Sequence, residues 1–155
     1  MGAVEGADVS EVSNRAIVER YMKAFPADFE VLGELRHPEY VEDWPQSGER
    51  IRGHERYVTI HQQYPGGLPE AETRRVVGSE DRWVQSPSFT LVRINGQGDS
   101  YTVEGTLAYP SGTSTHLVAI LELRGGQVAK VTHYFADPFE GPDWRAEWVE
   151  PIPGD

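Results

Sequence analysis

The chain has 155 residues, no cysteine, and a formal net charge of −11 from 14 basic and 25 acidic side chains. This length fits one compact domain, and the acidic balance argues against a nucleic-acid or anionic-membrane surface, because phosphate binding needs a basic face. The lack of cysteine excludes disulfides, thiolate catalysis and cysteine-ligated metal sites.

The N-terminal half has the periodicity of helices. Residues 1–10 are small and acidic and are expected to form a disordered head. Apolar side chains then recur at helical spacing: Ile17, Val18, Tyr21, Met22 and Phe25. Pro26 should end this helix. The spacing predicts two more helices, Phe29 to Leu35 and His54 to Tyr64, with an extended segment from Tyr40 to Pro45 between them.

The period changes to two from about residue 70, which is typical of strands. We expect strands over 73–77, 82–94 (interrupted at Pro87), 100–109, 113–124 and 128–136. Asn95-Gly96 and Gly125-Gly126 are predicted to form turns. The domain is therefore predicted to span residues 11–140, followed by a tail over 141–155 with Trp144 and Trp148 four residues apart.

Helices followed by a run of strands predict an α+β fold. We expect a cone-shaped, curved antiparallel sheet wrapped around the N-terminal helices. Such a sheet leaves a cavity between its concave face and the helices, and a cavity of this kind suits a small molecule.

Several motifs are absent. No glycine-rich phosphate loop, no H-E-x-x-H metal motif and no G-x-S-x-G nucleophile elbow occurs in the sequence. The five histidines lack the close spacing of a preformed metal site, so no metal is expected.

Glu104 is the first candidate catalytic residue. It is the only acidic residue between Tyr101 and Tyr109. A carboxylate in an apolar pocket has its pKa raised by desolvation and then exchanges protons near neutral pH. The alternative is that Glu104 is an ordinary surface acid, because Val103 and Leu107 occupy the other face of the strand.

The last predicted strand carries two further candidates. The Tyr134 phenol on a cavity wall is suited to donate a hydrogen bond to a developing oxyanion. His133 is suited to act as a proton shuttle. The alternative places Tyr134 in the core with its hydroxyl at the rim and His133 facing solvent.

Aromatic and polar side chains in the N-terminal half are candidates for lining the pocket. Large aromatic side chains give a pocket apolar area and a stacking surface. The predicted pocket residues are Tyr21, Trp44, His61 and Tyr64. Alternatively, Trp44 seals the core where helices meet the sheet, and His61 is a polar residue on an amphipathic helix.

Four segments resemble the nuclear-transport-factor-two-like superfamily, which includes SnoaL-like polyketide cyclases and ketosteroid isomerase. They are the first helix (Val18–Phe25), the segment Trp44–Gly53, the strand at Glu104–Thr106 and the ending Gly126–Pro138. The resemblance covers about residues 12–140. It implies a conical, cystatin-like α+β barrel with a deep apolar pocket, no cofactor, and a homodimer formed through the sheet.

The last strand departs from the pattern of related epoxide hydrolases and phenazine-pathway proteins. That strand ends there in an aromatic residue, Asp or Asn, and Pro, with a catalytic carboxylate three residues before the Asp or Asn. Counting back from Asp137, this position holds Tyr134, so the resemblance puts hydrolase and cyclase chemistry in doubt. Glu104 lies on a strand where such enzymes place another acid.

The sequence therefore predicts a small-molecule-pocket protein of the SnoaL-like type. One hypothesis is a cofactor-independent acid–base enzyme, with isomerase, cyclase or hydrolase-like chemistry on an apolar ring. In it Glu104 moves a proton, Tyr134 holds an oxyanion, and His133 or His61 can substitute. The alternative is a non-catalytic dimeric module that binds a small molecule or a protein.

The sequence has no apolar run of ~20 residues and no signal peptide. We therefore expect neither a membrane span nor export, and we predict a cytoplasmic location.

Overall fold

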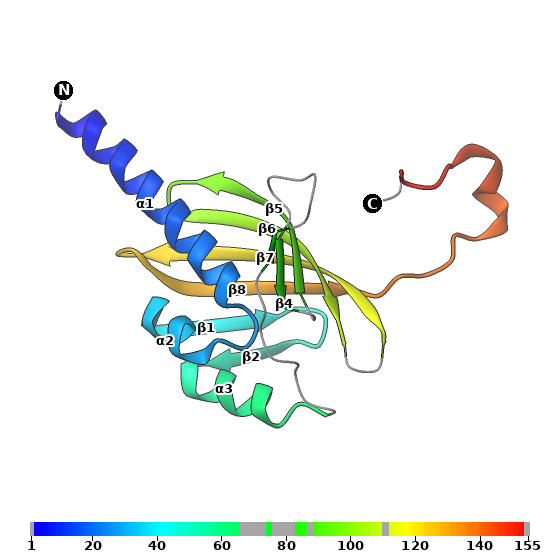
Figure 1. Cartoon of the computed structure of the whole chain (residues 1–155), viewed down its shortest axis with the longest axis horizontal. Coiled ribbons are helices and arrows are strands. Elements are labelled where there is room, and N and C mark those ends of the chain that lie inside the picture. Colours follow the sequence, from blue (N-terminus) through cyan, green and yellow to red (C-terminus); the bar gives the residue numbers. More distant parts are fainter. Residues whose placement is uncertain (1, 66–73, 76–82, 87–88, 110–111, 154–155) are drawn as a thin grey trace.

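The computed structural model describes residues 2–65, 74–75, 83–86, 89–109 and 112–153 (Figure 1). The helices are α1 (Gly2–Ala24), α2 (Phe29–Leu35), α3 (His54–Gln62) and the 3-10 helix η1 (Asp143–Trp148). The strands are β1 (Arg36–Trp44), β2 (Glu49–Arg52), β3 (Arg74–Arg75), β4 (Trp83–Ser86), β5 (Phe89–Gln97), β6 (Ser100–Ala108), β7 (Ser114–Arg124) and β8 (Gln127–Ala136). The predicted α+β class is confirmed.

The eight described strands form one curved sheet in the order β2-β1-β8-β7-β6-β5-β4-β3. All neighbours are antiparallel except β1, which runs parallel to β8. The sheet is thus mixed, whereas the sequence predicted a purely antiparallel one, because β1 joins the free edge of the last strand. With β2 and β3 at its edges, the sheet is not closed into a barrel.

Helix α1 lies across one face of the sheet, and α2 and α3 lie beside β1 and β2 (Figure 1). On β6 and β7, buried and exposed residues alternate strictly over most of each strand, as a half-buried antiparallel pair requires. The helix stripe predicted from Val18, Tyr21 and Met22 is buried in the core. That core lies between α1 and the inner face of the sheet.

The hairpin between β5 and β6 turns later than predicted. Strand β5 continues through Asn95-Gly96 to Gln97, and the turn falls at residues 98–99. Gly96 has a φ of 151°, and a Cβ added there would lie 2.7 Å from the Cα of Tyr101. Gly96 therefore lies within β5, where the lack of a side chain lets β5 and β6 approach each other closely, and it does not form the turn. The predicted turn at Gly125-Gly126 is confirmed, with φ values of 59° and 76°.

Other boundaries differ at the two ends of the chain. Helix α1 begins at Gly2, within the segment predicted to be a disordered head. Strand β1 begins at Arg36, four residues before the predicted extended segment. The tail leaves the sheet after Ala136 and projects away from it, carrying η1 (Figure 1). Most of the strand predicted over 73–77 lies outside the described residues. The segment predicted as one interrupted strand over 82–94 forms two strands, β4 and β5, that pair antiparallel, and residues 87–88 between them lie outside the described residues.

In the described part of the chain, no helix is long and apolar enough to cross a membrane. Among the same residues, no group of three or more His, Asp or Glu is arranged to hold a metal ion.

A buried cation lies where β1 meets the helices. The side chain of Arg36 is 1% exposed. Its guanidinium donates hydrogen bonds to the Tyr21 hydroxyl at 2.8 and 3.1 Å and to Nδ1 of His54 at 2.8 Å. It also lies over the rings of Tyr40 and Tyr57, at 4.3 and 3.8 Å from their centroids.

Among the described residues, the anionic neighbour of Arg36 is Glu42, at 4.0 Å and with its side chain also 1% exposed. Burying a lone charge is costly, so each of these two charges depends on the other. The pair ties β1 to α1 through Tyr21 and to α3 through Tyr57.

We expect Arg36→Met to lower the free energy of unfolding by about 3–5 kcal/mol, because it leaves the Glu42 carboxylate buried without its counter-ion. The measurement is urea denaturation followed by tryptophan fluorescence. Adding Glu42→Gln to Arg36→Met should restore part of the loss, since the double variant buries no charge. An equal loss in both variants would show that the packing of the guanidinium, and not charge compensation, stabilises the fold.

Candidate functional site

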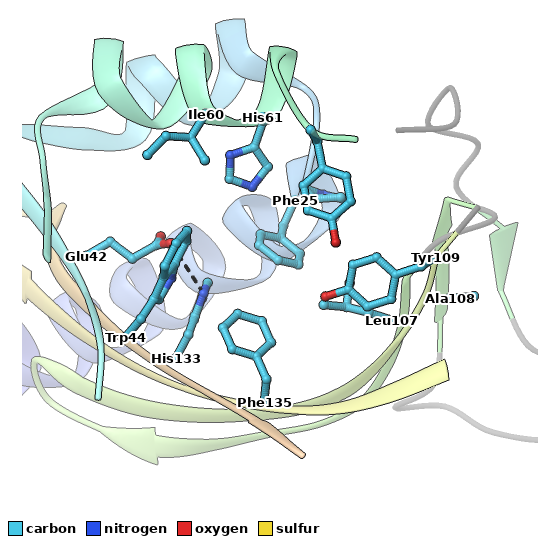
Figure 2. A pocket seen from close by; sticks show the side chains of 12 residues that line it. Phe25, Glu42, Trp44, Ile60, His61, Leu107, Ala108, Tyr109, His133 and Phe135 are labelled. Carbon is cyan, nitrogen blue, oxygen red and sulfur yellow. Dashed lines mark hydrogen bonds and ion pairs between the residues drawn. The ribbon is translucent and has the colours of Figure 1, made fainter. Parts of the chain in front are cut away.

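A cavity of about 280 Å³ lies between α3, the end of α1 and the inner face of the sheet (Figure 2). Its apolar wall includes Phe25, Trp44, Ile60, Leu107 and Phe135. Its polar wall is formed by Glu42, His61, Tyr64, Tyr109 and His133. A mostly apolar cavity with a few convergent polar groups is typical of a small-molecule site.

Glu42 is the buried acid of this cavity. The alternation of β1 points Tyr40 and Glu42 to the inner face. The Tyr40 hydroxyl donates to Oε1 of Glu42 at 2.5 Å, and the indole N–H of Trp44 donates to Oε2 at 2.8 Å. Sequence reasoning missed Glu42. The signal that it overlooked was an acid between two aromatic residues on the same face of a strand.

His133 contacts this carboxylate, with Nδ1 at 3.5 Å from Oε2 of Glu42. The rings of Phe25 and Phe135 pack against the imidazole with their centroids at 5.6 Å. Burial lowers the pKa of His133, although the charge of Glu42 opposes this shift. The imidazole is therefore neutral near pH 7. The carboxylate favours the tautomer with the proton on Nδ1, which leaves Nε2 as the acceptor.

His61 supplies a second imidazole from α3. Its Nδ1 lies 2.8 Å from the carbonyl oxygen of Tyr57, and its ring stacks on the Tyr57 ring at 3.8 Å. Because a carbonyl only accepts hydrogen bonds, Nδ1 carries the proton, and Nε2 of the neutral ring is an acceptor. Burial lowers the pKa of His61, so this ring also lacks a charge near pH 7.

Two phenols lie at another side of the cavity. Tyr64 and Tyr109 are stacked, with ring centroids at 5.7 Å and an interplanar angle of 17°. Figure 2 shows Tyr109 opposite Glu42 and Trp44. Burial, together with the neighbouring Tyr64 hydroxyl, raises the pKa of Tyr109 to about 12. This phenol therefore stays protonated and keeps a hydrogen to donate.

The structure places two of the predicted catalytic residues away from this cavity. Glu104 has a side chain that is 46% exposed, with Arg93 at 3.9 Å, and Tyr134 is 43% exposed. Both pair with Val118 of β7, so they lie on the outer face of the sheet. As candidate catalytic residues both were expected to face the cavity, but the packing of α1 determines which face of the sheet is the inner one. The alternative of Glu104 as a surface acid fits this position.

The other predicted site residues lie at the cavity or directly behind it. His133, Trp44, His61 and Tyr64 all line the cavity. Tyr21 does not line it: its buried hydroxyl bonds Arg36 and contacts the Tyr40 hydroxyl at 3.4 Å. The structure therefore brings His133 together with Glu42 and not with Glu104.

No protein-family model and no curated protein matches the chain. A solved NTF2-like protein of unknown function from Burkholderia xenovorans LB400 is 31% identical, over 91% of this chain and 96% of that one, with a TM-score of 0.69. A putative ketosteroid isomerase from Kribbella flavida DSM 17836 is 22% identical, over 94% of each chain, with a TM-score of 0.70. An LEH-like epoxide hydrolase from M. tuberculosis is 18% identical, over 81% of this chain and 84% of that one, with a TM-score of 0.56.

The last two similarities show a shared fold. The Burkholderia protein is more similar in sequence, and the similarity covers nearly all of both chains. It confirms the resemblance predicted from the four sequence segments: this chain belongs to the NTF2-like superfamily.

Proposed function

We propose that this protein is a cofactor-independent acid–base enzyme acting on a small, largely apolar ring molecule. The observation that carries the proposal is the contact between a buried carboxylate and a buried imidazole, Glu42 and His133, at the wall of an apolar cavity. A carboxylate behind a neutral imidazole fixes its tautomer and stabilises the imidazolium that forms when it takes a proton. Similarity in fold to a putative ketosteroid isomerase supports proton transfer in such a cavity.

The reaction class that fits this arrangement is proton abstraction next to a carbonyl. In a ketone with a C=C at the β,γ position, Nε2 of His133 takes a proton from the carbon between the carbonyl and the C=C, and the C–H electron pair moves into a dienolate. His133 then returns the proton to the far carbon of that C=C, and the net result is a double bond shifted into conjugation with the carbonyl. Phe25 and Phe135, which pack against the imidazole, exclude water from the enolate.

The second candidate function is a non-catalytic binding module. Two observations favour it. Both oxygens of Glu42 already accept hydrogen bonds, from Tyr40 and Trp44. The tail also exposes large aromatic side chains suited to a protein contact: Phe139 is 80% exposed, Trp144 73% and Trp148 74%.

The homodimer implied by the resemblance is also part of the proposal. Val118 is 37% exposed and lies between Glu104 and Tyr134 on the outer face of the sheet. The charged groups beside this row are partly neutralised within the chain, since Arg93 contacts Glu104 and Lys130 contacts Glu122. A face of this kind suits self-association despite the net charge of −11. The cytoplasmic location stays a prediction.

We expect the protein to convert cyclohex-3-enone to cyclohex-2-enone, which is measured by the ultraviolet absorbance of the conjugated enone. In D₂O, NMR should show deuterium at C4 of the product, the carbon to which His133 returns a proton, to the extent that the imidazolium exchanges with solvent. His133→Gln should lower the catalysed rate by about 10²- to 10⁴-fold, the usual contribution of one positioned acid–base group.

Glu104→Gln and Tyr134→Phe are the matched controls for this experiment, because both side chains lie on the outer face. Both variants should keep the wild-type rate. Binding of cyclohex-3-enone without turnover would favour the binding module, and a rate that depends on Glu104 instead of His133 would contradict the proposed site.

The lowered pKa values of His61 and His133 predict how stability depends on pH. Between the folded pKa and the unfolded value of ~6.5, the unfolded chain binds protons that the folded chain does not. The free energy of unfolding should therefore fall as the pH drops below about 6.5, as urea denaturation at several pH values would show. NMR titration of the two imidazoles should give lower pKa values in the folded protein than in urea. Equal values would contradict the buried, neutral imidazoles.

Val118→Asp should convert the proposed dimer to a monomer, because it buries two unpaired carboxylates near the centre of the contact. The measurement is sedimentation equilibrium. His116→Asp, exposed on the same strand, is the matched control and should affect the mass less. A wild-type protein that is monomeric at high concentration would contradict the dimer.

A further inference from the structure

The polar atoms that face the cavity define which hydrogen bonds a ligand can make. Nδ1 of His61 is committed to the Tyr57 carbonyl and Nδ1 of His133 faces Glu42, so each ring offers only Nε2 as an acceptor. Both Glu42 oxygens are already engaged by Tyr40 and Trp44. The described imidazole side of the cavity therefore accepts hydrogen bonds and does not donate them.

The phenol side has the opposite character. The rings of Tyr64 and Tyr109 are stacked, and Tyr109 stays protonated because burial raises its pKa. A protonated phenol can donate its hydrogen. The pair thus offers at least one donor to a ligand, while the apolar rings of Phe25 and Phe135 lie between the two polar sides (Figure 2).

We propose that the cavity binds a neutral, small ring compound with a hydrogen-bond acceptor at one edge, which meets the Tyr64–Tyr109 pair, and a hydroxyl donor at another, which meets Nε2 of His61. This inference rests on the proposed function and deepens it by naming the chemical class of the substrate. His61 is the imidazole that the proposed reaction leaves unused. Its position on α3, across the cavity from the sheet that carries His133, suits it to hold the ring (Figure 2).

The charge of the ligand follows from the groups around the cavity. The one carboxylate among the described lining residues, Glu42, has the Arg36 guanidinium at 4.0 Å behind it. The site therefore has little net charge to attract a cation. Burial also keeps both imidazoles uncharged and Tyr109 protonated. A charged ligand would lose its hydration without finding a free partner charge, and a neutral ligand avoids that cost.

The test is a series of single-ring probes whose dissociation constants are measured by isothermal titration calorimetry at pH 7.5. 4-Methoxyphenol has both groups, 1,4-dimethoxybenzene lacks the donor, and 4-methylphenol lacks the ether acceptor. 4-Methoxybenzoate and 4-methoxybenzylammonium carry a charge. We expect 4-methoxyphenol to bind tightest, by about three- to tenfold over each neutral analogue, the usual value of one net hydrogen bond, and by more over both charged probes.

Three variants assign the contacts. His61→Phe keeps a ring for stacking and should remove the advantage of 4-methoxyphenol over 1,4-dimethoxybenzene. The double variant Tyr64→Phe/Tyr109→Phe should remove its advantage over 4-methylphenol. Tyr134→Phe deletes a phenol on the outer face and should leave the whole ranking unchanged. Equal binding of the three neutral probes to the wild-type protein, or tightest binding of either charged probe, would overturn the inference without any variant.

These measurements need no turnover, so they fail independently of the proposed function. If 4-methoxyphenol binds tightest and cyclohex-3-enone is not converted, the proposed ligand class is supported and the proposed acid–base activity is contradicted. If cyclohex-3-enone is converted and the neutral probes bind equally, the enzyme stands and the ligand class is wrong.

Discussion

The buried guanidinium of Arg36 is the constraint on which the site depends. It holds Tyr21 of α1 by hydrogen bonds and the Tyr57 ring of α3 by stacking, so both helices are fixed against the start of β1. Its charge lies 4.0 Å from Glu42, which in turn contacts His133 on β8. A cation that touches no described wall of the cavity thus supplies the opposite charge beside the carboxylate that contacts the imidazole.

The parallel pairing of β1 with β8 makes this arrangement possible. Glu42 is in register with Val131, two residues before His133 on the same face of β8. Residues in register on adjacent strands share a face of the sheet, and so do residues two apart on one strand. Glu42 and His133 therefore project to the same side of the sheet. The paired residues Glu42 and Val131 are 89 positions apart in the sequence, and no local pattern in either segment specifies this pairing. The two segments that form the site are therefore brought together by tertiary pairing and not by any local pattern.

The dependence of the site on long-range pairing explains which parts of the fold and of the site could be predicted from the sequence. The helix Phe29–Leu35 and the turn at Gly125-Gly126 follow from local spacing and backbone preference, and both are confirmed. Alternation also grouped Glu104 with its outer-face neighbours. What it does not specify is which face is inner, because that depends on where α1 packs. Glu42 was missed for another reason: Tyr40, Glu42 and Trp44 share one face of β1, but alternation alone does not show that Arg36 and Tyr40 accompany a buried carboxylate there.

The cost of the network favours the proposed enzyme over the binding module. Buried ion pairs are seldom a source of stability, and well-packed apolar side chains of similar volume often perform as well or better. A cavity that only enclosed an apolar ring would need Phe25, Leu107 and Phe135 and no acid. Instead, two charges and two imidazoles are held out of water beside an apolar surface. Polar groups retained at such cost are expected where their protons or lone pairs are used. The imidazole of His133, neutral and backed by a carboxylate, is the group best placed to use them.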